Sequence, residues 1–117
     1  MQRNWELIRE ILLKVESLPN NGSLKASDLD DYYDLDVISH FALLGKAGYV
    51  EVIDVSSLAG ENYICTGLTW AGHDFLEKVR DDTIWKKTVS LVKAKGVELS
   101  FDTIKIAVGV VVKNLFE

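Results

Sequence analysis

The stretch VISHFALLGKAGYV, residues 37–50, has the clearest local pattern in the chain. Its apolar residues Val37, Phe41 and Leu44 recur at spacings of three and four. That spacing is typical of a helix with one face turned into a core. We therefore predict a helix over residues 34–47 whose inward face is formed by these side chains.

The end of this helix leads into a predicted β-hairpin. Gly48 stands where the left-handed residue that ends a helix belongs. Residues 49–55, YVEVIDV, are β-branched and aromatic, and residues 62–68, NYICTGL, have a similar character. Both are predicted strands, joined by a loop of medium length that contains Gly60.

Upstream, residues 4–18 have the pattern of an amphipathic helix, with Asn4 as its N-cap. The helix is expected to end at the turn-forming run Pro19–Gly22. Its apolar stripe consists of Trp5, Ile8, Ile11, Leu12 and Val15.

Residues 23–33, SLKASDLDDYY, are short and acidic and allow two interpretations. One is a strand or extended segment around residues 24–29, which we favour. The other is a short helix capped by Ser27. In either case Asp34 is the expected N-cap of the helix over 34–47.

Downstream, Thr69 is the expected cap of a helical run that reaches Lys95, with Gly96 as its terminator. The sequence leaves open whether this run is one bent helix or two pieces. Ser100 caps a last element over residues 101–116, for which we favour a helix, although its β-branched residues also allow a strand.

The last element is apolar almost all round. A helix of that kind is either enclosed by the fold or buried against a partner, and we favour a homodimer. The residues assigned to this core or dimer contact are Ile104, Val108, Val111, Val112 and Leu115.

The order of elements predicts an α+β protein with a winged-helix-like domain followed by two additional C-terminal helices. The winged-helix-like part consists of a helix, a short strand, a helix and a β-hairpin. We expect one domain over residues 1–117, with its core in 1–68 and the C-terminal helices in 69–117.

The chain also resembles a bacterial and phage family known only as domain-of-unknown-function family 2513. The similarity covers WELIREILLKVE (5–16), YYDLDVISHFALLGKAGYVEVIDVSS (32–57), LTWAGHDFLEKVRDDTIWKK (68–87) and LSFDTIKIAV (99–108). The resemblance implies a winged-helix-like, uncharacterised protein, and it carries no catalytic motif.

Composition excludes several classes of protein. The single cysteine among 117 residues rules out an internal disulfide framework and a four-cysteine zinc site. No stretch approaches the roughly 20 apolar residues of a membrane span, and the N-terminal MQRNWELIRE lacks the apolar region of a signal peptide. We expect a cytoplasmic protein without a membrane partner or cofactor.

A non-enzymatic DNA-binding regulator is the favoured function and duplex DNA the first candidate partner, because winged-helix modules place such a helix in the major groove. Serine, histidine and lysine side chains on the outer face would supply the contacts, and the only basic segment is residues 69–96, with a net charge of +2. The candidate contact residues are Ser39, His40, Lys46, Lys86, Lys87 and Lys93.

Another protein is the second candidate partner, which would make the chain an adaptor or inhibitor. Residues 19–36 contain one lysine and five aspartates, a local charge of −4 that disfavours contact with phosphates. The candidate partner contacts are Asp28, Asp30, Asp31, Tyr32 and Tyr33.

An enzyme is the least favoured class. His40 and His73 are accompanied by no HxxxH, HExxH or cysteine pair of a metal site. Cys65 lies in a strand pattern and is interpreted as a small packed residue. We therefore expect no catalytic residue, no metal ligand and no cofactor.

Overall fold

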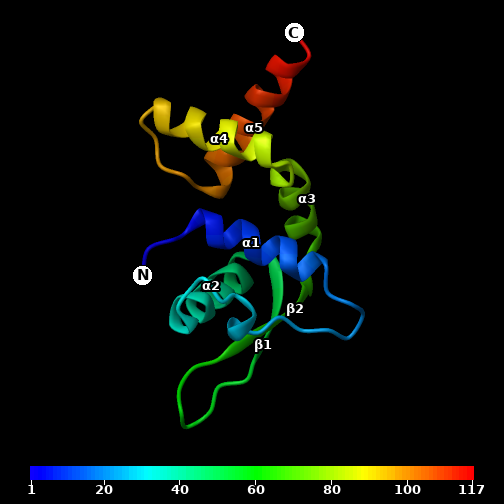
Figure 1. Ribbon diagram of the computed structural model, residues 1–117, viewed down its shortest axis with the longest axis vertical. Coiled ribbons are helices and arrows are strands. Elements are labelled where there is room, and N and C mark those ends of the chain that lie inside the picture. The colour runs from blue at the N-terminus through cyan, green and yellow to red at the C-terminus, as the bar shows by residue number, and fades with distance from the viewer. The chain divides into compact units, whose positions relative to one another are not determined.

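The computed structural model describes residues 1–117 and divides into two compact units, Met1–Asp74 and Phe75–Glu117. The predicted α+β class is confirmed, and so is the order of a helix, a short extended segment, a helix, a hairpin and further helices (Figure 1). The predicted single domain with a division after residue 68 stays a prediction. The elements are α1 (Trp5–Glu16), the 3-10 turn η1 (Ala26–Asp28), α2 (Asp34–Ala47), β1 (Val50–Asp54), β2 (Tyr63–Leu68), α3 (Trp70–Val79), α4 (Asp82–Ala94) and α5 (Phe101–Leu115).

Helix α2 is anchored as its spacing predicts. Val37, Phe41 and Leu44 are at most 1% exposed, because all three lie on the face that turns into the core. Gly48 ends the helix in the left-handed conformation, with φ at 84°. The predicted N-cap was wrong by one residue. Asp34 is already helical, and the extended residue before the helix is Tyr33.

The hairpin follows α2 directly. β1 and β2 pair antiparallel, with Val50 opposite Leu68 and Asp54 opposite Tyr63. Both α1 and α2 pack against these strands, while the loop between the strands extends away from the two helices (Figure 1). The contact with α2 is close at Gly45, where an added Cβ would meet Val52.

The ambiguous segment 23–33 is extended at Leu24 and forms a 3-10 turn over Ala26–Asp28, and the alternative of a helix capped by Ser27 is wrong. Leu24 pairs with Cys65 through two backbone hydrogen bonds of 2.8 and 3.0 Å, so the favoured extended conformation is correct there. The chain then turns into η1, where the Lys25 N–H donates to an Asp28 carboxylate oxygen at 2.9 Å. Ser27 lies within the turn and does not cap it.

Local capping explains the remaining helix boundaries. Asn4 caps α1 as predicted, since its side-chain oxygen accepts from the Leu7 N–H at 3.1 Å. The open question about the helical run to Lys95 is answered by Asp81, which caps a separate α4 by accepting from the Ile84 N–H at 2.9 Å.

Helix α5 confirms the prediction of a helix over a strand. Ser100 and Thr103 form a reciprocal capping box, with hydrogen bonds of 3.0 and 2.9 Å. The Phe101 ring in its first turn lies edge-on to Phe75, with ring centroids 4.8 Å apart. The apolar character of the helix nevertheless does not mean burial on all sides, since Ile106 is 70% exposed.

Candidate functional site

Charge divides sharply between the two units. Residues 1–74 contain five Lys and Arg side chains against twelve Asp and Glu, a net charge of −7. Residues 75–117 contain eight against six, a net charge of +2. The acidity of the whole chain, −5, therefore comes entirely from the first unit.

The acidic segment, residues 28–36, presents apolar side chains among carboxylates. Tyr33 is 84% exposed and Leu35 is 76% exposed, although both are large enough to favour burial. Leu29 anchors the segment to the core. Its side chain is buried, and its carbonyl oxygen accepts a hydrogen bond from the Tyr32 N–H at 3.2 Å. The exposed carboxylates around these side chains are Asp28, Asp30, Asp31, Asp34 and Asp36.

Helix α1 adds further negative charge beside this segment. Burial raises the pKa of the Tyr32 hydroxyl, and the carboxylates of Glu10, Glu6 and Asp31 raise it further, as does a hydrogen bond with Glu10. Tyr32 is half-buried, so it supports the segment and Tyr33 presents its ring to solvent. The structure thus brings the predicted partner contacts together and adds two glutamates from another helix.

A groove of about 400 Å³ adjoins the acidic segment. It lies between η1, the first half of α2 and the hairpin, and Asp34 belongs both to its lining and to the segment. Its apolar lining comes from Ala26, Ile38, Val55 and Ile64. Sequence reasoning missed this groove, because its walls come from separate elements and no single stretch contains the pattern.

The hairpin carries no cation. The chain has no Lys or Arg between residues 47 and 77, and the loop exposes the apolar side chains of Val55 and Leu58. The nearby carboxylate of Glu61 raises the pKa of the Tyr63 hydroxyl, with smaller contributions from desolvation and from Asp54. A loop with this charge repels phosphates.

The predicted DNA contacts on α2 require one correction. The prediction that His40 faces outward was wrong, because the side chain is 2% exposed and hydrogen-bonded at both ring nitrogens. Ser39 is half-buried, and Lys46 is exposed near the end of the helix. The three remaining candidates, all exposed and all on α4 of the second unit, are Lys86, Lys87 and Lys93.

Cys65 and His73 form no reactive constellation. Cys65 is fully buried in β2, as predicted for a packed residue, and desolvation raises the pKa of its thiol to about 12. His73 lies exposed on α3. No group of three or more His, Cys, Asp or Glu side chains is placed to hold a metal ion. None of the helices is both long enough and apolar enough to cross a membrane.

The residues assigned to a core or dimer contact on α5 fall into different environments. Ile104, Val108 and Val111 are buried, and Val112 is half-buried. Leu115, at the end of the helix, is 52% exposed. The first three are therefore core residues of the chain itself, and the homodimer stays a prediction.

Comparison with known proteins agrees with the earlier resemblance. The model of the family described as "Hypothetical protein (DUF2513)" matches residues 2–98. A protein of Haemophilus influenzae, itself described as uncharacterized, is 45% identical over 106 residues, which covers 90% of each chain. No solved structure matches the chain. The match to the family model over most of the chain, together with this relative, establishes that the chain belongs to the DUF2513 family.

Proposed function

We propose that this chain is a non-enzymatic protein-interaction module, an adaptor or inhibitor, whose acidic segment binds a basic segment of a partner protein. The observation that carries the proposal is the exposure of Tyr33 and Leu35 in a segment that also exposes five aspartates, beside an apolar groove. Apolar anchors surrounded by charge are the arrangement that protein interfaces use.

Each part of this surface has a separate role in the proposal. Tyr33 and Leu35 supply apolar area that a partner covers, and tyrosine is enriched among the residues that dominate binding energy. The aspartates attract a basic partner over a distance and reject acidic ones. The neighbouring groove, with Ile38 and Ile64 in its walls, accepts one apolar side chain of the partner.

A DNA-binding regulator is the second candidate. It is supported by the helix–hairpin order of the first unit and by the exposed cations Lys86, Lys87 and Lys93 of α4. The first unit argues against it, because it has a net charge of −7 and Lys46 is the only cation of α2. Phosphate contacts dominate affinity for DNA, so an acidic helix and loop oppose binding there. The fold alone does not decide function.

The test compares three labelled probes on the full chain by fluorescence anisotropy at low and high salt. The probes are a short designed peptide of lysine and leucine, the same peptide with glutamate in place of lysine, and a duplex oligonucleotide. The proposal expects the basic peptide to bind best and to weaken as salt is added. Tighter binding of the duplex, or equal binding of the two peptides, would refute it.

Variants then locate the binding surface. D30N/D31N removes two charges from the acidic segment, and we expect about tenfold weaker binding of the basic peptide, since each removed charge contact contributes up to about 1 kcal/mol. Leu35→Ser removes an apolar anchor without touching the core, because the side chain is exposed. The matched control is E61Q/E98Q, two exposed carboxylates outside the segment. Equal losses in the control would show that only overall charge matters.

A further inference from the structure

The outer face of α5 contains an exposed stripe of four residues. Asp102, Ile106, Gly109 and Lys113 follow one another at spacings of four, three and four, which places them on one side of a helix. All four are exposed, and the opposite side carries the buried residues of this helix. An exposed isoleucine and a glycine thus lie between a negative and a positive end.

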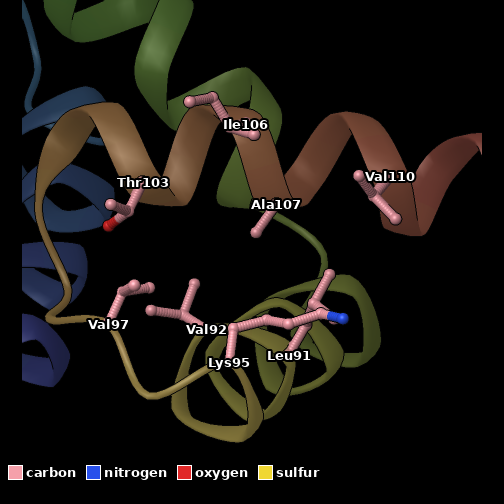
Figure 2. Close-up of a pocket in the computed structure, with 8 residues that line it drawn as sticks. All are labelled: Leu91, Val92, Lys95, Val97, Thr103, Ile106, Ala107 and Val110. Carbon is pink, nitrogen blue, oxygen red and sulfur yellow. The ribbon is translucent and has the colours of Figure 1, made fainter.

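An apolar groove within the second unit adjoins this stripe at Ile106. It has a volume of about 350 Å³ and lies between α4 and α5. Figure 2 shows Ala107 and Val110 pointing from α5 toward the side where Leu91, Val92 and Lys95 lie. Val110 is 43% exposed. The exposed apolar area of α5 therefore continues into a concave surface.

We propose that this stripe pairs with the same stripe of a second copy of the chain, in antiparallel orientation. Reversing one helix about the midpoint between Ile106 and Gly109 places Ile106 of each copy opposite Gly109 of the other. The same operation places Asp102 of each copy opposite Lys113 of the other. Both ends of the stripe then meet opposite charges, as a two-fold interface between identical surfaces requires.

The shape of the stripe also fits this antiparallel pairing. Nothing lies within 4 Å of the position that a Cβ of Gly109 would occupy, so the site has room for the Ile106 side chain of a second copy. In the same register Val110 falls between Thr103 and Ala107 of the other helix, at the edge of the groove. This insertion of one side chain between residues four apart is the packing used by paired helices.

The ion pair that Lys113 makes within the chain is weak enough to be exchanged for one with a second copy. Lys113 has an intrachain partner in Glu117, but their nitrogen and oxygen lie 3.9 Å apart and both side chains are largely exposed. Such a pair contributes little to stability and exchanges readily for another partner. The inference uses only the second unit, so it stands or falls independently of the acidic segment.

Sedimentation equilibrium of the full chain tests the pairing directly. The stripe is short, so we expect weak association, with the mass rising from 13.1 kDa toward twice that value as the concentration enters the range from about micromolar to millimolar. D102K and K113D each create like charges at both ends of the pair, and we expect each to weaken self-association about tenfold or more. K86E, on α4, is the control for an exposed charge reversal and leaves association unchanged.

Mixing the two variants gives the sharpest result. In a mixed pair the lysine introduced by D102K faces the aspartate introduced by K113D at one end, and the native Asp102 and Lys113 face each other at the other end. D102K and K113D should therefore associate with each other while each fails alone, and the double variant D102K/K113D should associate with itself. Failure of both rescues overturns the antiparallel register.

Ile106→Lys gives an independent measurement, because a side chain that is 70% exposed is replaced without disturbing the core. We expect this variant to remain a monomer at every concentration. A wild-type chain that stays at 13.1 kDa throughout, or a dimer that survives Ile106→Lys, overturns the proposal.

Discussion

The buried imidazole of His40 accepts a hydrogen bond from the backbone N–H of Asn4, with 2.9 Å between Asn4 N and His40 Nε2. The other ring nitrogen, Nδ1, lies 2.7 Å from the Asp36 carbonyl oxygen, to which it donates. The neutral ring therefore links α2 to the residue that caps α1. A side chain used in this way is unavailable for contact with a base edge.

Replacing His40 by leucine tests this link. His40→Leu puts an apolar side chain of similar volume in place of the imidazole and leaves the Asn4 N–H without its partner, so we expect a loss of about 1–2 kcal/mol in the free energy of unfolding. Urea denaturation followed by circular dichroism measures the loss. Ser39→Ala, one residue away and half-buried, is the control and should change stability by less than about 0.5 kcal/mol. Equal stability of the two variants contradicts the structural role.

The Cys65 thiol should make stability depend on alkaline pH. Its pKa is raised by burial from an ordinary value of 9.0 to about 12. Above pH 9 the unfolded chain therefore loses the thiol proton while the folded chain keeps it. The protonated thiol therefore favours the folded state. Its contribution to the free energy of unfolding is fully present below pH 9 and is lost as the pH rises toward 12, by up to about 1 kcal/mol per pH unit.

A comparison with Cys65→Ala isolates this effect from the titration of lysines and tyrosines. The variant is less stable at neutral pH because it creates a small cavity, but its stability should fall less steeply above pH 9. Iodoacetamide should label native Cys65 only on the timescale of unfolding. If the free energy of unfolding falls equally steeply above pH 9 in both proteins, the raised pKa of the Cys65 thiol is contradicted.

Thr88 offers a route to a more stable protein. Its hydroxyl oxygen is buried in α4 and has no hydrogen-bond partner. Thr88→Val replaces the hydroxyl by a methyl group of similar size, and we expect a gain of about 1 kcal/mol, because the buried unsatisfied group is removed. Thr83→Val, at an exposed position of the same helix, is the control. A melting temperature that falls for Thr88→Val alone would indicate an ordered water at the site.

Gly72 should tolerate no side chain. A Cβ at this position would clash with the Tyr49 carbonyl oxygen, since Thr69 ties the first turn of α3 to the junction after α2. We expect Gly72→Ala to lower the free energy of unfolding by about 1–3 kcal/mol. A Cβ at Gly109 would lie in open space, so Gly109→Ala should raise the free energy of unfolding by up to about 1 kcal/mol when it is measured at low concentration, where the chain is a monomer. Similar changes in the free energy of unfolding for both variants would argue against the close contact between Gly72 and the Tyr49 carbonyl oxygen.

The sequence predicted most of the fold because its signals are local. The spacing of Val37, Phe41 and Leu44 depends only on helix geometry, and Gly48 ends the helix through its own backbone conformation. The boundaries at Ser100 and Thr69 depend on side chains that bond within three residues. Each of these patterns is complete within a few neighbouring residues.

The site was predicted less well because its parts come from distant segments. The acidic segment was visible in the composition, but its glutamate neighbours on α1 and the groove beside it were not. His40 was placed on the wrong face because a polar side chain usually faces solvent. Its inward orientation depends on Asn4, a residue 36 positions earlier in the chain.

The sequence alone thus determined the order of the helices and the hairpin, the caps at Asn4, Thr69 and Ser100, and the acidic character of residues 28–36. Only the tertiary structure decided which polar side chains are buried, which apolar ones remain exposed on α2 and α5, and where grooves open between elements. The physical reason is that helix and strand formation follow from neighbours a few residues apart. Burial and surface shape depend on which distant segments meet.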